Sequence, residues 1–103
     1  MRRNLMSVST EGAATVVEVH GALDLESTDS LRALLAQLRR ESDVIVEIRH
    51  VDFCDSSGIS VLATAARDAQ LNGHEVTVRH AHPSVEHILR LTGCDWLLQT
   101  RGA

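Results

Sequence analysis

The chain is poor in the residues that several common functions require. Its 103 residues include no lysine and no tyrosine, and Phe53 and Trp96 are its only Phe, Trp or Tyr residues. Without lysine, the Gly-rich phosphate loop that ends in Lys-Ser/Thr is excluded. Two aromatic side chains provide no platform on which single-stranded bases could stack. Because the net charge of −4 also repels phosphate backbones, no nucleic acid is expected as a partner.

Cysteine, proline and long apolar runs are scarce as well. Cys54 and Cys94 are far apart and neither belongs to a Cys-x-x-Cys pair, so neither a zinc site nor a disulfide framework is indicated. The first residues lack the apolar stretch of a secretory signal, and no run approaches the roughly 20 residues of a membrane helix. We therefore expect a cytoplasmic protein with no membrane partner.

The composition that remains is typical of one folded domain. Hydrophobic residues make up 44% of the chain and charged residues 23%, which supports a packed core and argues against disorder. The length leaves no room for a second substrate domain. No linker, repeat or low-complexity tract divides the chain, so residues 1–103 are interpreted as a single domain.

The first half of the chain predicts a hairpin, a helix and a strand. Two β-branched segments, Leu5–Ser9 and Thr15–His20, flank a turn at Glu11–Gly12. A helix over Thr28–Arg40, with Ser27 as its cap, follows from leucines at helical spacing. These leucines, which we assign to the core, are Leu31, Leu34, Leu35 and Leu38. In the strand that begins at Val44, apolar residues alternate with Glu47 and Arg49, so one of its faces is largely polar.

The second half repeats this alternation. The pattern predicts a helix from near Ser57 to Asn72–Gly73, followed by a strand over Glu75–Arg79. A third helix begins at Pro83 and ends at Thr92–Gly93, and a short last strand follows over Trp96–Leu98. The order ββαβαβαβ gives an α/β fold with a mixed sheet of about five strands and an N-terminal hairpin. Because the strands are half polar, the helices should lie mainly on one face.

The segment Val51–Ile59 is the best candidate for a functional site. It joins the central strand to the second helix, at the carboxyl edge where ligands of parallel sheets bind. A serine there meets unpaired N–H groups and can either cap the helix or carry a phosphate. The simpler interpretation is that Ser56 or Ser57 caps the helix while Asp55 complements its dipole. A hydrolase elbow is disfavoured because Cys54 stands where that turn needs glycine, so no enzyme activity is expected.

Two short motifs connect these residues to a family. Asp55-Ser56-Ser57-Gly58-Ile59 after an amphipathic strand, together with Gly21-Ala22-Leu23-Asp24 before the first helix, resembles the STAS domain of bacterial anti-sigma factor antagonists. The segment from Pro83 to Gly93 is similar to that family's third helix. The resemblance extends from Met6 to Leu98. One departure is Ala22, where the family commonly has glutamate.

The resemblance implies a phosphorylation switch without a cofactor. The unphosphorylated form would bind an ATP-binding anti-sigma factor serine kinase and release a sigma factor, in a stress response or in sporulation. Phosphorylation of Ser56, or as second choice Ser57, would switch it off, and a cognate phosphatase would reverse this. The implied partner-binding residues are Leu23, Asp24, Asp55, Ser57, Gly58, Ile59 and Leu62, the last two on an exposed side of the second helix. An alternative role for a STAS domain is a constitutive subunit of a lipid-transport ATPase complex or a signalling scaffold.

Neither the histidines nor the cysteines indicate a metal or redox site. His80 and His82 could share a strand face, but no carboxylate or thiol stands at ligand spacing, so no metal is expected. The other histidines are scattered along the chain, and we expect them at the surface. Cys54 is near the candidate switch, yet an inert, partly buried thiol is the favoured interpretation over a redox role.

Overall fold

Strands β1 (Leu5–Glu11), β2 (Ala14–Leu23), β3 (Val44–Cys54) and β4 (Val76–Arg79) form one mixed sheet in that spatial order. The computed structural model describes residues 5–38 and 40–99. β1 pairs antiparallel with β2, and the hairpin turns at Gly12, whose φ of 62° favours glycine. β3 is parallel to both β2 and β4. The predicted hairpin and the parallel crossovers are thereby confirmed.

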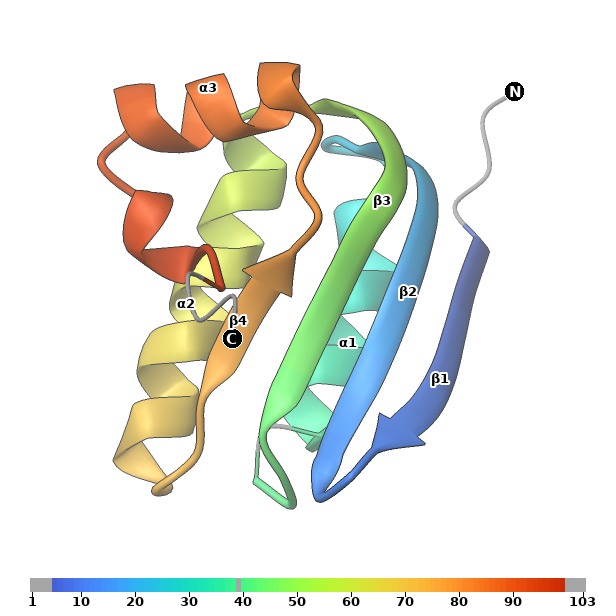
Figure 1. The fold of residues 1–103 in the computed structure, drawn as a ribbon, viewed down its shortest axis with the longest axis vertical. Coiled ribbons are helices and arrows are strands. Elements are labelled where there is room, and N and C mark those ends of the chain that lie inside the picture. Colours follow the sequence, from blue (N-terminus) through green and yellow to red (C-terminus); the bar gives the residue numbers. More distant parts are fainter. Residues whose placement is uncertain (1–4, 39, 100–103) are drawn as a thin grey trace.

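The helices lie mainly on one face of the sheet, as the half-polar strands predict. Figure 1 shows α1 (Thr28–Leu38) and α2 (Ser56–Leu71) behind the strands, and α3 (Pro83–Leu91) across one end. Leu31 and Leu35 of α1 are fully buried, and its other two leucines pack against the same core. The predicted end of α1 at Arg40 is two residues too late, with Arg39 outside the described residues. The leucine stripe of α1 is therefore a core stripe.

The predicted last strand is wrong in its main part. Asp95–Leu97 forms a single 3-10 turn, η1, and only Leu98 makes an isolated parallel bridge, to Val78 of β4. The backbone N–H of Gln99 donates to the Val78 carbonyl at 2.7 Å. The prediction rested on the apolar run Trp96–Leu98, and three residues are too few to distinguish a strand from a 3-10 turn. The described part of the sheet thus has four strands instead of about five.

Two register shifts bend β3 relative to β2. The strands lose regular pairing between Glu18 and His20 and again between Gly21 and Ala22. Each shift leaves two consecutive residues of β3 exposed, first Arg49 and His50 and then Asp52 and Phe53. Bulges of this kind redirect side chains and are rare between parallel strands. In this sheet they place His50 opposite His20 and bring Cys54 beside Leu23.

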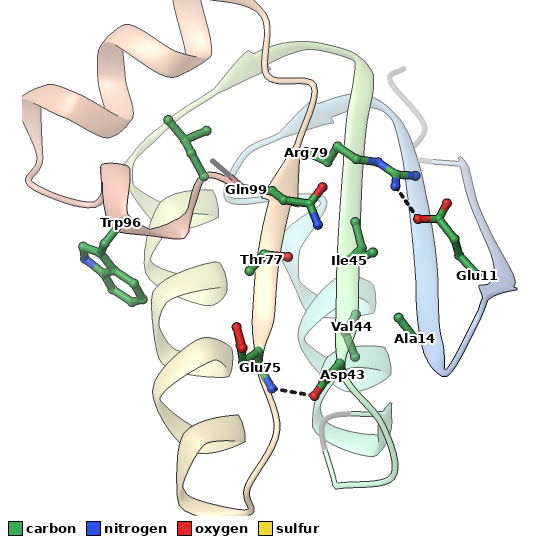
Figure 2. Close-up of a pocket in the computed structure, with 11 residues that line it drawn as sticks. Glu11, Ala14, Asp43, Val44, Ile45, Glu75, Thr77, Arg79, Trp96 and Gln99 are labelled. Carbon is green, nitrogen blue, oxygen red and sulfur yellow. Dashed lines mark hydrogen bonds and ion pairs between the residues drawn. The ribbon is translucent and has the colours of Figure 1, made fainter. Parts of the chain in front are cut away.

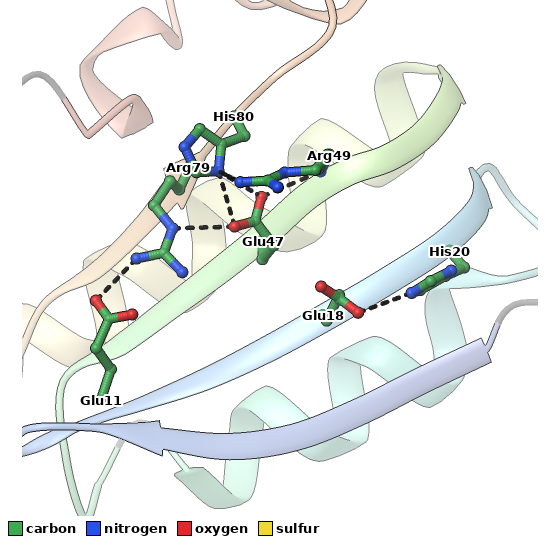
Figure 3. Close-up of polar contacts among 7 residues, drawn as sticks. All are labelled: Glu11, Glu18, His20, Glu47, Arg49, Arg79 and His80. Carbon is green, nitrogen blue, oxygen red and sulfur yellow. Dashed lines mark hydrogen bonds and ion pairs between the residues drawn. The ribbon is translucent and has the colours of Figure 1, made fainter.

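A buried carboxylate lies on the face of the sheet opposite α1 and α2. Glu47 of β3 is 4% exposed, and its Oε1 accepts from Arg79 Nε at 3.0 Å and lies 2.8 Å from His80 Nδ1. Its other oxygen accepts from the Arg49 backbone N–H, and Arg79 also pairs with Glu11 (Figure 3). Burial by itself would raise the pKa of Glu47, but the bonds from His80 and Arg79 outweigh it and the pKa is lowered.

Glu47 should make the fold sensitive to acid. Its folded-state pKa lies below the ordinary 4.5, so its contribution to stability is complete above that pH and is lost as pH falls through the folded-state value. We expect Glu47→Gln to reduce the free energy of unfolding by about 1–2 kcal/mol at pH 7, because Arg79 loses a charged partner. Urea titrations at pH 7 and pH 3.5 test this: the variant should differ less from the wild type at the lower pH. An equal difference at both values would contradict the expectation.

Candidate functional site

Asp55, and neither serine, caps the candidate helix. Its side chain accepts hydrogen bonds from the backbone N–H of Ser57 at 3.0 Å and of Gly58 at 3.3 Å, and from the Ser57 hydroxyl. The interpretation of Ser56 or Ser57 as the cap is therefore wrong. Asp55 has the extended backbone of an N-cap residue, and its carboxylate reaches the N–H groups of the first turn. Ser56 and Ser57 are therefore the first two residues of the helix and not its cap.

This arrangement leaves Ser56 available at the surface. Ser56 is the first residue of α2 and is exposed, and its hydroxyl makes no hydrogen bond within residues 5–38 and 40–99. Ser57 is only partly exposed and its hydroxyl is bound to Asp55. The two adjacent serines therefore differ. A partner can reach the Ser56 hydroxyl without breaking a hydrogen bond to any described residue, whereas the Ser57 hydroxyl would first have to leave Asp55.

The capping contacts also keep Asp55 ionised. The hydrogen bond from the Ser57 hydroxyl lowers the pKa of Asp55 most, partial burial opposes it, and the backbone N–H groups of Gly58, Ser57 and Leu25 add to the lowering. The contact with Leu25 joins the start of α2 to the loop after β2. A fixed negative charge thus stands directly beside Ser56.

The two sequence motifs meet at one edge of the sheet. Leu23 pairs with Cys54 at the carboxyl ends of β2 and β3, and the Asp55 backbone N–H donates to the Leu23 carbonyl at 3.0 Å. Asp24 shapes its own turn, because its carboxylate accepts from the Ser27 N–H at 3.1 Å. The Ser27 hydroxyl donates to the Ala22 carbonyl at 2.7 Å and accepts from the Asp24 N–H, so it stabilises the loop before α1.

Several predicted contact residues are in the core. Leu23 is 0% exposed, Ile59 4% and Leu62 1%, so the expected exposed side of α2 at these positions is wrong. Ile59 and Leu62 face the sheet because α2 buries a wide apolar stripe rich in alanine. Gly58 is buried too, where a Cβ atom would lie 2.6 Å from the Leu23 carbonyl oxygen. These four residues position the site and present no side chain to a partner.

The residues that can meet a partner here include some that the sequence analysis missed. Leu25 is 76% exposed and Phe53 is 46% exposed, and both flank the two loops. A groove of about 190 Å³ lies between α1 and α2, and the exposed residues Arg32, Ser60 and Thr64 line it. An apolar residue in a loop was the available signal for Leu25, since exposed large apolar side chains are typical of interfaces.

A larger hollow lies away from these loops. It measures about 570 Å³ and follows β4 from Glu75 to Arg79, with Ala14 and Asp43 on one side and Trp96 on the other (Figure 2). Arg79 is a cation in its wall, and it is already paired with Glu11 and Glu47. No residue of the Asp24–Leu25 loop or of the Asp55–Ser57 turn lines this hollow, so it is separate from the candidate site.

Cys54 is poorly suited to redox chemistry. The thiol is 2% exposed, and burial, reinforced by the charge of Asp55, raises its pKa to about 12. We expect only Cys94, which is partly exposed, to react with Ellman's reagent in the native protein at pH 8. Cys54 should react after denaturation in urea. Rapid reaction of two thiols in native protein, with Cys94→Ser still giving one, would contradict this expectation.

The fold and the site define a class of protein. An α/β domain that presents an exposed serine at the start of its central helix, beside a second loop from the same sheet edge, is typical of STAS domains. The chain belongs to the STAS family described as "Mlab, STAS domain", which matches residues 6–99. No helix among the described residues is long and apolar enough to cross a membrane.

Named relatives agree with this assignment. The chain is 26% identical over 81 residues to the anti-sigma F factor antagonist of Paenibacillus polymyxa, covering 76% of this chain and 69% of that protein. An anti-sigma factor antagonist from Mycobacterium paratuberculosis has a TM-score of 0.82 at 20% identity, covering 93% of this chain and 83% of that one. Two structures of the antagonist SpoIIAA each cover 92% of this chain. The unphosphorylated form has a TM-score of 0.79 at 16% identity over 86% of its own chain. The phosphorylated form, from Bacillus, has a TM-score of 0.73 at 15% identity over 89%.

Proposed function

We propose that this protein is an anti-sigma factor antagonist that is switched by phosphorylation of Ser56. In the unphosphorylated state it binds an ATP-dependent anti-sigma factor kinase, and the sigma factor is released. The kinase transfers the γ-phosphoryl group of ATP to the Ser56 hydroxyl, which loses its proton, and ADP is the leaving group. A phosphatase then hydrolyses the phosphoester with water and restores the hydroxyl. The protein itself acts as a binding domain and catalyses neither step.

One observation carries this proposal. Ser56 is exposed at the start of α2 and its hydroxyl forms no hydrogen bond to any residue that the structure describes, while Asp55 has the capping role that would otherwise occupy a serine. A kinase can therefore reach Ser56 without unwinding the helix. The relative that exists in phosphorylated and unphosphorylated forms shares this fold, which is consistent with a switch on the same scaffold.

The proposed partner surface differs from the one expected from sequence. It comprises Asp24 and Leu25 of the first loop, Phe53, the Asp55–Ser57 turn and the exposed rim of α2 at Ser60 and Thr64. Leu25 and Phe53 provide apolar area, and the two carboxylates provide charge around it. This combination of an apolar centre and a polar rim is typical of specific interfaces.

Intact mass spectrometry tests the site of modification. The unmodified protein is incubated with ATP and candidate anti-sigma factor kinases encoded near its gene, and a single phosphate is expected. Ser56→Ala should abolish the mass increase. Ser57→Ala and Ser60→Ala, which remove neighbouring hydroxyl groups, are the matched controls and should retain it. Phosphate on Ser57 in the wild type would assign the switch to the second-choice serine.

A constitutive STAS subunit of a lipid-transport ATPase complex is the second candidate. The family that matches residues 6–99 is described as "Mlab, STAS domain", a description that names no anti-sigma factor and so leaves a subunit role open. Such a subunit would use the same surface but would need no phosphate. Co-purification with an ATPase subunit, by wild type and Ser56→Ala alike and with no phosphorylated form, would support this candidate over the switch.

A further inference from the structure

Three potential metal ligands gather on the helix-free face of the sheet. Glu18 and His20 are alternate residues of β2, and His50 is paired with His20 across the β2–β3 ladder. The ligand atoms of the three side chains all lie within 4.8 Å of one another. Figure 3 shows Glu18 and His20 side by side on β2, where His20 Nε2 is 2.9 Å from Glu18 Oε1. The cluster lies apart from the Ser56 loop, and none of its residues belongs to the proposed partner surface.

The first register shift of β3 creates this cluster. Glu18 pairs with Glu47, so regular pairing would place Arg49 opposite His20. The extra residue in β3 places His50 there instead, and the two imidazole rings stack with centroids 4.6 Å apart and an interplanar angle of 24°. A permanent cation is thereby replaced by an imidazole, which is a metal ligand when neutral.

We propose that Glu18, His20 and His50 form a binding site for Zn²⁺. Two imidazoles and one carboxylate are a donor set that Zn²⁺ accepts in proteins, with water completing a tetrahedron. The side chains of Glu18 and His20 are 38% and 42% exposed and His50 is exposed, so an ion can enter from solvent. The Glu18 carboxylate offsets part of the positive charge of Zn²⁺. The same negative charge repels anions, so an anion is a poor ligand for this site.

The arrangement needs only side-chain adjustment. Two ligand atoms bound to one tetrahedral Zn²⁺ lie roughly 3.3 Å apart, since each is about 2.0–2.1 Å from the metal. The Glu18–His20 pair, at 2.9 Å, is already near that spacing. His50 must move toward this pair by rotation about its side-chain torsions, and because the ring is exposed, the core does not oppose the movement.

Calorimetric titration of untagged, metal-free protein with ZnCl₂ tests the proposal. We expect saturable binding of one Zn²⁺ per chain. His20→Ala, His50→Ala and Glu18→Gln should each weaken the affinity at least about 10-fold, since even outer-shell partners of a metal contribute about 10–100-fold. His87→Ala, which removes an exposed histidine from α3, is the matched control and should bind like the wild type. Circular dichroism verifies that each variant folds.

Binding of Co²⁺ gives an independent readout of the ligands, because its visible absorption reports coordination. A spectrum lost in both histidine variants and kept in His87→Ala supports the site. Absence of saturable binding overturns the proposal, as does a loss below 10-fold in either histidine variant. Affinity unchanged by Glu18→Gln overturns the three-ligand assignment. None of these outcomes depends on phosphorylation of Ser56, so failure here would leave the proposed switch intact.

Discussion

Phosphorylation of Ser56 is expected to weaken binding of the kinase partner at least about 30-fold while the domain stays folded. The phosphate would add about −1.5 to −2 charges to a surface that must lose water when the partner docks. One close charge contact at an effective dielectric constant of 20 is worth about 4 kcal/mol, and half of that value corresponds to about 30-fold in affinity. The ionised Asp55 beside Ser56 adds to the negative charge of the surface.

The fold should tolerate the phosphate because Ser56 is exposed at the positive end of α2. Favourable interaction with the helix dipole, about 0.3–1 kcal/mol, offsets repulsion from Asp55. The N–H groups of Ser57 and Gly58 are already engaged by Asp55, so they provide little further stabilisation. We expect the melting temperature to change by no more than about 4–8 °C, the equivalent of roughly 1 kcal/mol.

Melting temperature and partner affinity, measured on the same samples, separate the two effects. Ser56→Asp should lose affinity in part, because it carries one charge and fewer acceptor oxygens than a phosphate. Ser56→Ala should bind like the wild type and resist phosphorylation. Ser84→Ala, which removes an exposed hydroxyl from the first turn of α3 and lies outside the proposed surface, should behave like the wild type in both assays. The proposal fails if the phosphorylated protein binds as tightly as the unmodified protein, or if binding is lost only where folding is lost.

The elements that were predicted correctly are those with a clear period. The hairpin follows from β-branched alternation, and α1 follows from four leucines that the structure places in or against the core. Pro83 and the Asn72–Gly73 pair mark helix ends because their backbone preferences are strong, and Gly73 has a φ of 77°. Trp96–Leu98 contains too few residues for a period to distinguish a strand from a 3-10 turn.

The surface of the candidate site was harder to predict than its location. The sequence identified the loop before α2, but Ile59 and Leu62 were placed on the wrong side of the helix. Eight of the residues of α2 are buried, among them alanines whose small side chains contribute little to a helical pattern. The cluster of Glu18, His20 and His50 could not be predicted, because it depends on a register shift between strands that leaves no local pattern.

Replacing Gly58 with alanine is expected to destabilise the fold, contrary to the usual effect of this change inside a helix. At an open helical position Gly→Ala stabilises by roughly 0.5–1 kcal/mol. At Gly58, however, the new Cβ would lie 2.6 Å from the Leu23 carbonyl oxygen, 2.9 Å from Leu23 Cβ and 3.2 Å from Cys54 Sγ. Overpacking of this kind costs about 1–3 kcal/mol, so the free energy of unfolding should fall.

The clash cannot be relieved by rotating a side chain, because its nearest atom belongs to the backbone. The Leu23 carbonyl accepts a hydrogen bond from the Asp55 N–H, and Leu23 pairs with Cys54 at the end of the parallel ladder. Moving Leu23 therefore disturbs both loops of the candidate site. The absence of a side chain at position 58 allows α2 to start close against β2, and this close approach brings the Asp55 turn and the loop after β2 together.

Urea unfolding of Gly58→Ala measures the effect, with Gly12→Ala as the matched control. A Cβ at Gly12 would meet no atom within 4 Å, so that variant reports only the cost of a positive φ, about 1–2 kcal/mol. Gly58 does not have a positive φ, so a loss of stability in Gly58→Ala would come from the steric clash of the new Cβ atom. Faster reaction of Cys54 with Ellman's reagent should accompany the change, since its sulfur is one of the displaced atoms. Unchanged or increased stability in Gly58→Ala, with Cys54 still unreactive, would show that α2 and β2 can separate at this point without cost.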